Sequence, residues 1–528
     1  MLVPLTPLRA LLRAADLFSS QVGIVCGEKE FTYGQFVARC GRLATALRGA
    51  GIQHGDRVAF LSFNTHKLLE GYYGVVQAGA IVMPLNVRLS PQELITILNH
   101  SGARMVCFEN DFVPMVTALR GRVKGVERWV ALDDAIPLAD LTYEELIATG
   151  RPELPDVQSV DENAIAELFY TSGSTGTPKG VMLSHRNLWQ HALSVAAINK
   201  EPDTVDLHTI PLFHANGWGR PQCSTLLGFK QVMVRRFDPT TVFTLIERHR
   251  ANEMSLVPTM ANMLLNAPNV EQFDLSSLRT IMLGGAASSP ELVQRMEARF
   301  HCDVFAGYGL TETSPVLTTG RLPAYMKDLP DPERYRRQSM AGWPIPGAEV
   351  RVADLMGEPV PRDGKTIGEV LARGDNVMMG YYKEQAATDA VMMGGWFHTG
   401  DMAVWDETGA IHIVDRKKEI IISGGENISS IEVERAIFSH PDVFECAVVA
   451  APDNQWGEVP AAIVVLKPGA ALTEETLLRY LEAHLGKFKL PRVVEFSAEP
   501  LPKTGTGKIR KLILREKFWG AKERRVQG

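Results

Sequence analysis

The sequence predicts an α/β protein. It has a large N-terminal domain of layered α/β sheets with a small β subdomain, followed by a small α+β C-terminal domain. Its 528 residues exceed one ordinary domain. Short apolar runs alternate with helical patterns over residues 31–107 and again over 187–308, which favours mostly parallel sheets. Between residues 341 and 415 glycine and proline become frequent and the apolar runs shorten, as in a β subdomain. We therefore expect the N-terminal domain over 1–415 and the C-terminal domain over 416–528.

The first part of the chain contains clear helix and strand signals. Thr32 is a good N-cap for a helix that runs to Arg48, after which two glycines close it. Residues 1–20 predict an amphipathic helix rather than a signal peptide, because charged residues interrupt the apolar run. The other elements expected here are strands at 57–62 and 80–84 and helices at 66–78 and 91–101.

Three polar segments follow apolar strands in the middle of the chain, at residues 213–218, 284–287 and 309–313. Ligand sites in open α/β sheets gather beyond the carboxyl ends of the strands, so we expect the three segments to line one cleft. The strands expected in this part are 207–212, 253–258, 278–283 and 304–308, and the helices are 187–198, 240–249 and 290–300.

The last quarter of the chain predicts a hairpin and a compact tail. Residues 402–406 and 410–414 form apolar strands joined by a short glycine-containing turn. The tail of roughly 110 residues has the size of a small domain. Its expected elements are helices at 430–438 and 473–484 and strands at 446–450, 461–466 and 492–496.

Composition and charge exclude several classes of protein. A hydrophobic content of 45% with 22% charged residues is ordinary for a globular chain, and no apolar stretch is long enough to span a bilayer. The net charge of −6, without a long charged run, gives no electrostatic case for nucleic acid. The six cysteines show no C-x-x-C spacing, which indicates reduced thiols and a cytoplasmic protein rather than a disulfide or zinc framework.

One loop has the composition of an anion site. After Tyr170 it holds five hydroxyl residues, three glycines, a proline and a lysine. Exposed N–H groups and hydroxyls can wrap a polyphosphate while the lysine adds a point charge; the alternative is a flexible Ser/Gly linker. Pro178 before Lys179 and Gly180 after it depart from the P-loop of NTPases. The residues expected to bind the phosphates are Thr171, Ser172, Gly173, Ser174, Thr175, Gly176 and Lys179.

Four later segments accompany this loop. They read Gly-Tyr-Gly-Leu-Thr-Glu-Thr at 307–313, Phe-His-Thr-Gly-Asp at 397–401, Asp-Arg-Lys-Lys-Glu at 415–419 with Ser-Gly-Gly-Glu-Asn at 423–427, and Leu-Pro-Lys-Thr-Gly-Thr-Gly-Lys at 501–508. In this order the five segments resemble the signature of the adenylate-forming superfamily, in its acyl-CoA synthetase and fatty-acid–CoA ligase branch. The resemblance covers essentially the whole chain and implies that the C-terminal domain is mobile.

The same resemblance implies an adenosine site. Tyr308 offers an aromatic face on which adenine can stack, with room beside it at Gly309; a core tyrosine at a strand end is the alternative. Asp401 can accept two hydrogen bonds from a ribose diol, although a Thr-Gly-Asp segment is also typical of a plain turn. The other residues that the resemblance places around the nucleotide are Gly285, Ala286, Ala287, Gly307, Thr311 and Arg416.

Glu312 is the candidate metal ligand. A carboxylate beside a triphosphate needs a cation between them, and Mg²⁺ prefers carboxylate and phosphate oxygens. The resemblance implies that Glu312 and Thr171 bracket this ion. A carboxylate favoured by a helix N-terminus is an alternative for Glu312 that is compatible with the first.

Lys508 is the candidate catalytic lysine. It lies in a glycine-bracketed loop, and a preorganised cation would offset the repulsion that arises when a carboxylate attacks the α-phosphate. Without its flanking pattern it would be a solvated surface lysine. The resemblance assigns it to the adenylation step and places the hinge of the mobile domain at Lys418.

The acyl and CoA sites are also assigned by resemblance. His214 is placed at the junction of the acyl and pantetheine groups and is counted as catalytic, and Trp218 matches the tryptophan that gates the acyl tunnel of fatty-acyl members. A core histidine and a packing tryptophan are the alternatives. Gly424 and Gly425 suit a narrow passage for pantetheine. The remaining acyl candidates are Gly284 and Thr313, and the remaining CoA candidates are Trp456, Phe488 and Arg492.

We therefore expect an AMP-forming acyl-CoA synthetase that makes acyl-AMP and pyrophosphate from a carboxylic acid and Mg·ATP, and then transfers the acyl group to CoA. Mostly small or apolar pocket candidates favour a medium- to long-chain fatty acid over short-chain or aryl acids. A stand-alone ligase that loads a carrier protein is an alternative, and so is a non-catalytic nucleotide or acyl-CoA sensor, against which Glu312 and Lys508 argue. The expected partners are small molecules, and the resemblance suggests a homodimer.

Overall fold

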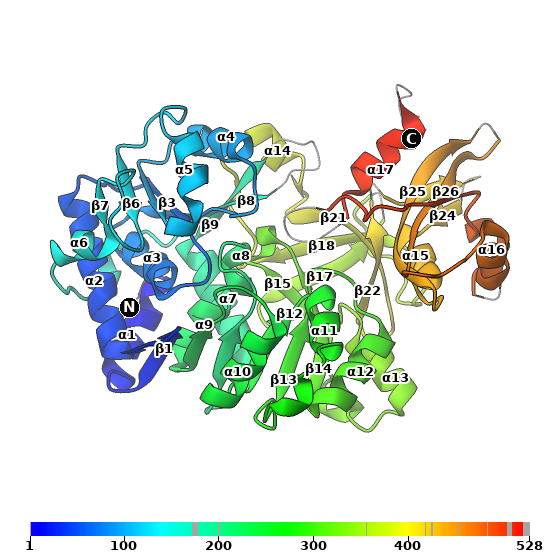
Figure 1. The fold of residues 1–528 in the computed structure, drawn as a ribbon, viewed down its shortest axis with the longest axis horizontal. Coiled ribbons are helices and arrows are strands. Elements are labelled where there is room, and N and C mark those ends of the chain that lie inside the picture. Colours follow the sequence, from blue (N-terminus) through cyan, green and yellow to red (C-terminus); the bar gives the residue numbers. More distant parts are fainter. Residues whose placement is uncertain are drawn as a thin grey trace. The chain divides into compact units, whose positions relative to one another are not determined.

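The computed structural model describes residues 2–171, 178–198, 201–354, 356–417, 419–423, 426–453, 455–482, 484–503 and 509–520. The chain forms two compact units (Figure 1). Unit 1 comprises Met1–Val350 and Ala372–His398, and unit 2 comprises Arg351–Leu371 and Thr399–Gly528. The mixed α/β class, with a large N-terminal and a small C-terminal part, is confirmed. The boundary expected between residues 415 and 416 is that of a mobile C-terminal domain, and it stays a prediction.

Unit 1 contains a nine-stranded and an eight-stranded sheet. The strands from β14 to β1 in the first and from β8 to β7 in the second are parallel, and the remaining pairs are antiparallel. The first has the order β16-β15-β14-β13-β12-β10-β11-β1-β2 and the second β19-β9-β8-β4-β3-β5-β6-β7. The strands of the first are β1 (Val22–Cys26), β2 (Lys29–Thr32), β10 (Val205–His208), β11 (Lys230–Met233), β12 (Glu253–Leu256), β13 (Thr280–Leu283), β14 (Asp303–Gly309), β15 (Val316–Thr319) and β16 (Trp343–Pro344). Those of the second are β3 (Arg57–Leu61), β4 (Ile81–Pro84), β5 (Met105–Phe108), β6 (Arg128–Ala131), β7 (Leu141–Thr142), β8 (Ile165–Thr171), β9 (Lys179–Ser184) and β19 (Gly380–Tyr381).

The helices of unit 1 cover these sheets and fill the space between them. They are α1 (Leu8–Leu17), α2 (Tyr33–Gly49), α3 (His66–Gln77), α4 (Pro91–Ser101), α5 (Val113–Leu119), α6 (Tyr143–Ala148), α7 (His185–Ile198), α8 (Ala215–Trp218), α9 (Arg220–Leu227), α10 (Pro239–His249), α11 (Pro258–Leu265), α12 (Pro290–Phe300), α13 (Asp331–Gln338) and α14 (Gln385–Asp389). Helix α3 is buried on every side because it packs against β1 of one sheet and β3, β4 and β8 of the other. Helices α10, α11 and α12 cover the nine-stranded sheet with one apolar cluster (Figure 1).

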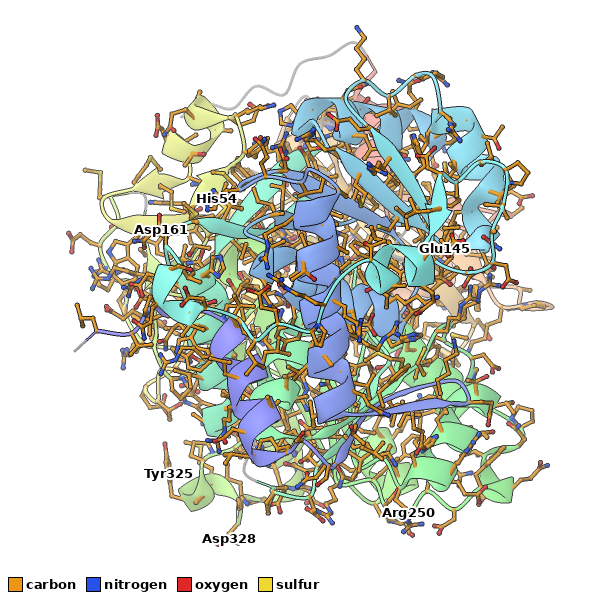
Figure 2. The ribbon with its side chains drawn as sticks, turned by 90° about the vertical axis from the view of Figure 1, so that its left-hand side faces the viewer. His54, Glu145, Asp161, Arg250, Tyr325 and Asp328 are labelled. Carbon is orange, nitrogen blue, oxygen red and sulfur yellow. The ribbon has the colours of Figure 1, made fainter. Side chains whose placement is uncertain are left out.

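Local sequence signals explain where several helices begin and end. Thr32 caps α2 through a capping box with Gln35, as the sequence predicts. Glu145, labelled in Figure 2, closes the same kind of box at the start of α6. Arg250, labelled in the same view, ends α10 in a left-handed conformation with a φ of 53°.

Two predicted strands are too long. The strand expected over 207–212 ends at His208, because the amide group of Asn64 donates to the carbonyls of His208 and Ile210 and accepts from the N–H of Leu212. These bonds replace ladder partners and turn the chain out of the sheet. The strand expected over 253–258 ends at Leu256, since Pro258 is the first residue of α11.

Unit 2 is organised around a five-stranded sheet in the order β24-β23-β26-β25, with β27 paired to β26. Along β25 and β26 alternate residues face α15 and α16 on one side and α17 on the other. The elements are β23 (Ile421–Ser423), β24 (Glu426–Ile428), α15 (Ser430–Phe438), β25 (Val443–Asp453), β26 (Gly457–Leu466), α16 (Glu474–Glu482), β27 (Val493–Phe496) and α17 (Lys511–Trp519). The strands that precede these in the chain are β17 (Ala348–Ala353), β18 (Gly368–Gly374), β20 (Met392–Met393), β21 (Trp396–Trp405) and β22 (Ile411–Arg416), of which β20 belongs to unit 1.

Two further observations bear on the environment of the chain. Within the described ranges, no helix has the length and apolar character needed to cross a bilayer. All six cysteines, which lie in described parts of the chain, are free thiols.

Gly309 gives a test of the fold at the end of β14. A Cβ at this position would lie 1.8 Å from the carbonyl oxygen of Pro315, so the absent side chain permits a close backbone approach. We expect Gly309→Ala to lower the free energy of unfolding by roughly 1–3 kcal/mol or more, measured by urea unfolding. Gly49→Ala is the control, because no atom lies within 4 Å of its Cβ position and helix α2 ends there. Equal stability of the two variants would contradict this account.

Candidate active site

The predicted phosphate loop begins and ends on two paired strands. Thr171 at the end of β8 lies opposite Lys179 at the start of β9, and Tyr170 lies opposite Gly180. The ladder therefore places the hydroxyl residue and the lysine side by side at the base of the loop. The other predicted phosphate ligands, Ser172, Gly173, Ser174, Thr175 and Gly176, lie outside the described residues.

Glu312 lies in the short 3₁₀ turn Thr311–Thr313 that follows β14. Its Oε1 accepts a hydrogen bond from the hydroxyl of Tyr381 at 2.9 Å, and its main-chain carbonyl accepts one from the N–H of Met378 at 2.8 Å. The segment before and within β19 therefore fixes both the backbone and the carboxylate of Glu312. Thr313, a predicted acyl-binding residue, is buried, and its hydroxyl donates to the carbonyls of Leu310 and Pro315.

Lys179 contacts the same tyrosine. Its Nζ lies 4.9 Å from the centroid of the Tyr381 ring, a distance typical of a cation–π contact. Strand β19 pairs with β9, with Tyr381 opposite Val181. The side chain of Tyr381 therefore contacts both Lys179, at the base of the loop, and the carboxylate of Glu312.

The described residues fit a magnesium ion that arrives with a nucleotide. No group of three or more His, Cys, Asp or Glu side chains in the described part of the chain is placed to hold a metal ion by itself. Glu312, in the turn after β14, and Thr171, at the end of β8, would instead supply one carboxylate and one hydroxyl. Such a small set suits Mg²⁺, which takes its other ligands from phosphates and water.

The predicted adenine and acyl candidates meet at the carboxyl ends of β13 and β14. These strands are parallel, with Leu283 opposite Ala306, so Gly284 and Gly307 follow side by side. A Cβ at Gly284 would lie 3.1 Å from the carbonyl oxygen of Gly307 and 2.9 Å from Cη2 of Trp218. Segments 213–218 and 284–287 are thus in contact through Trp218 and Gly284, and the single cleft expected for the three segments stays a prediction.

The nucleotide candidates here remain accessible. Gly285, Ala286 and Ala287 are exposed, and Tyr308 is half-buried. An accessible aromatic face beside exposed backbone is what stacking of a purine requires. Their roles stay predictions.

The segment that carries His214 and Trp218 has an unusual backbone. From Ala215 to Gly219 the φ angles are 45°, 44°, 58°, 62° and 73°, so five successive residues are left-handed. For residues other than glycine this conformation costs roughly 1–2 kcal/mol each. His214 is half-buried at the start of α8, and Trp218 is buried.

Glu167 stabilises this strained segment from β8. Its fully buried carboxyl group accepts hydrogen bonds from Nδ2 of Asn216 at 3.1 Å and Nε2 of Gln222 at 2.9 Å. Burial raises the pKa of Glu167 to about 8, although the two amide donors lower it. A residue four positions before Thr171 therefore fixes the backbone that leads into Trp218.

Arg220 is engaged inside the nine-stranded sheet. Its Nε donates to Asp206 at 3.0 Å and its Nη1 lies 2.9 Å from Glu253. The guanidinium is buried between these carboxylates, so it is not directed at a second carboxylate on a substrate.

The predicted ribose candidates lie together in unit 2. Asp401 on β21 is opposite Arg416 on β22, and Oδ1 of Asp401 lies 2.6 Å from Nε of Arg416. The plain turn considered for Thr-Gly-Asp is wrong, because these residues belong to the continuous strand β21. Gly400, with a φ of 72°, allows that strand to kink without ending.

The CoA candidates of unit 2 are partly described. The guanidinium of Arg492 lies 5.6 Å from the ring centroid of Trp456, and Phe488 is 51% exposed. Lys503 and Ile509 form an isolated antiparallel bridge on either side of residues 504–508. The predicted residues Lys418, Gly424, Gly425 and Lys508 lie outside the described residues.

Sequence reasoning did not identify three of the residues that shape this site: Glu167, Asn216 and Tyr381. Glu167 is a charged residue inside an apolar strand, and that contrast is a usable signal. Tyr381 has no such signal, because its two contacts depend on pairing between β19 and β9, about 200 positions apart.

Comparison with known families places the chain. A model of the AMP-binding enzyme family matches residues 11–382, and a model of the AMP-binding enzyme C-terminal domain matches residues 432–508. The chain belongs to the AMP-binding enzyme family, within the adenylate-forming superfamily that its motifs resemble. It is an AMP-forming acid–thiol ligase of the acyl-CoA synthetase class.

Individual relatives differ in their named acids. The chain is 40% identical to a long-chain-fatty-acid–CoA ligase of Thermus thermophilus, over 92% of this chain and 90% of that protein. It is 37% identical to a 2-methylpropanoate–CoA ligase of Humulus lupulus, over 97% and 95% of the two chains. Among solved structures, the anthranilate CoA ligase AuaEII in complex with anthranoyl-AMP superposes with a TM-score of 0.86 at 25% identity, over 98% of each chain.

Glu167 predicts a pH dependence of stability. In the folded chain the carboxyl group stays protonated up to about pH 8, whereas in the unfolded chain it ionises above about pH 4.5. Unfolding between these values releases a proton, so stability falls as pH rises, by up to about 1.4 kcal/mol per pH unit. We expect Glu167→Gln to remove this slope, measured by urea unfolding between pH 5 and pH 8.

Glu145→Gln is the control for this experiment. Hydrogen bonds from Thr142 lower the pKa of Glu145, so its titration lies below the measured window. Curves for Glu167→Gln and the unmodified chain that run parallel from pH 5 to pH 8 would contradict the assignment.

Proposed function

We propose that this chain activates a medium- to long-chain monocarboxylic acid with ATP and transfers the acyl group to CoA. The observation that carries the choice of acid is the surface around Trp218, at the strand ends beside Gly284. There Trp218 belongs to a buried apolar cluster with Ile210, Met282, Phe305, Val316 and Ile345. The engagement of Arg220 with Asp206 and Glu253 supports a substrate with a single carboxylate. The Thermus thermophilus relative, named for long-chain fatty acids, agrees with this choice.

In the first step, the loop from Thr171 to Lys179 would hold the phosphates that leave as pyrophosphate. Glu312 and Thr171 would hold Mg²⁺, which when bound neutralises phosphate charge. Tyr308 would stack on adenine, while Asp401, paired with Arg416, would bind the ribose. The adenosine contacts and the phosphate contacts then fix the α-phosphate where the substrate carboxylate can attack it.

A second step at the same centre needs a different set of groups. We propose that residues 416–528 rotate about Lys418, which brings Lys508 to the centre for adenylation and the face around Gly424 and Gly425 for thioester formation. The thiol of CoA would pass His214, with its nucleotide near Trp456, Phe488 and Arg492. The separate match of the C-terminal family model supports such a movable part.

The setting of the enzyme is also a proposal. Six free cysteines support a cytoplasmic location. The expected partners are the small-molecule substrates, and the homodimer suggested by resemblance stays a prediction.

A panel of acids tests the proposed substrate. CoA-dependent AMP release should be highest, by kcat/KM, for octanoate, dodecanoate or hexadecanoate, and lower for butanoate, 2-methylpropanoate, benzoate and cinnamate. A highest value for butanoate or benzoate would overturn the chain-length assignment. AMP release that needs a carrier protein rather than CoA would favour the carrier-loading alternative.

Lys508→Ala tests the catalytic lysine. Because the lysine would stabilise charge at the α-phosphate only during adenylation, we expect acyl-AMP formation to fall by about 100- to 1,000-fold. Thioester formation from preformed acyl-AMP should stay near the unmodified rate. The control is Lys503→Ala, since Lys503 pairs with Glu445 at 2.5 Å and should matter little to either step. Equal losses in both half-reactions would refute the assignment.

A further inference from the structure

Tyr381 occupies a position that the proposed function makes important. It ends β19, where it lies opposite Val181 of β9, and it is 8% exposed. The N–H of the next residue, Tyr382, donates to the carbonyl of Gly180 at 2.7 Å, and the N–H of Met379 donates to Met182 at 3.0 Å. These bonds fix the backbone on both sides of Tyr381 to the strand that follows the phosphate loop.

The side chain of Tyr381 contacts two groups of opposite charge. Its hydroxyl donates to Oε1 of Glu312 at 2.9 Å, and its ring face lies 4.9 Å from Nζ of Lys179. Lys179 and Val181 point to the same side of β9, so the diagonal neighbour of Tyr381 across the ladder is Lys179. In the described part of the chain no direct ion pair joins Lys179 to Glu312.

We propose that Tyr381 is the residue that positions the metal ligand and the loop lysine for the triphosphate. This inference rests on the proposed function, which places Mg²⁺ on Glu312 and phosphate beside Lys179. A donor on one carboxylate oxygen orients the other oxygen toward a cation, as partners of metal ligands commonly do. The ring holds the ammonium by its face without neutralising it, so the charge stays available to phosphate.

Two other contacts hold the backbone around Glu312, so the hydroxyl of Tyr381 acts on the carboxylate alone. The N–H of Met378, three residues before Tyr381, donates to the carbonyl of Glu312 at 2.8 Å, and the amide of Asn376 donates to the carbonyl of Thr313 at 3.1 Å. The backbone around Glu312 is therefore fixed by other residues of this segment. Loss of the Tyr381 hydroxyl alone should free the carboxylate without displacing the turn.

Tyr381→Phe isolates the hydroxyl, because phenylalanine keeps the ring face for Lys179. The primary measurement is ATP binding by titration calorimetry at increasing Mg²⁺ without any acid, so it does not depend on the identity of the substrate. We expect the half-saturating Mg²⁺ concentration to rise by roughly 10- to 100-fold. ATP affinity at saturating Mg²⁺ should change little, and Tyr381→Leu, which also removes the ring, should weaken it further.

Tyr382→Phe is the matched control. This neighbouring tyrosine packs its ring against His100, 6.0 Å between centroids, and should leave the Mg²⁺ dependence unchanged. A Tyr381→Phe curve that coincides with the unmodified chain would overturn the proposal, as would an equal shift in Tyr382→Phe. An unmodified chain that binds Mg·ATP but adenylates no acid would refute the proposed function while the binding curves still decide the role of Tyr381. In an active enzyme, a KM for the acid that stays constant in Tyr381→Phe would support a role confined to the metal and nucleotide.

Discussion

The buried carboxyl group of Glu167 links the two sheets of unit 1. It belongs to β8 of the eight-stranded sheet, and it accepts hydrogen bonds from Asn216 and Gln222 in the segment that follows β10 of the nine-stranded sheet. Burial of a carboxyl group is unfavourable unless donors compensate, and two amides do so here. Because β8 continues directly to Thr171, the same strand fixes the base of the phosphate loop and the strained turn before Trp218.

This link explains why a strained backbone can persist beside the apolar surface. Five left-handed residues in succession are unfavourable unless the surroundings over-determine them. Asn216 is held by Glu167 within the turn, and a Cβ at Gly219 would lie 2.2 Å from Cε1 of His191, which leaves no room for a side chain at this position. His191 in turn accepts a hydrogen bond from the N–H of Val316 at 3.0 Å. The geometry beside Gly284 is therefore set by buried polar contacts rather than by apolar packing alone.

How far the sequence determines these features depends on the distance between partners along the chain. The cap at Thr32 is local, so it and the helix it begins were predictable. The strand end at His208 was not, because it depends on Asn64, more than a hundred positions away. The five motifs located the candidate site through resemblance, yet they gave no signal for Tyr381. They also left open whether Asp401 lies in a turn, and the ladder between β21 and β22 decides for a strand.

The charges around the proposed hinge bear on how a rotation could proceed. Asp415 and Glu419 flank Lys418 in sequence, and within unit 2 Lys511 lies 3.5 Å from Glu419 and 2.9 Å from Glu434. Asp415 also faces this lysine and accepts a hydrogen bond from the N–H of Ser430. Rotation of residues 416–528 would keep Glu419 and Glu434 beside Lys511 but would separate Asp415 from both partners. Because a buried carboxylate is costly without its partners, these contacts of Asp415 would favour the arrangement seen here over rotated ones.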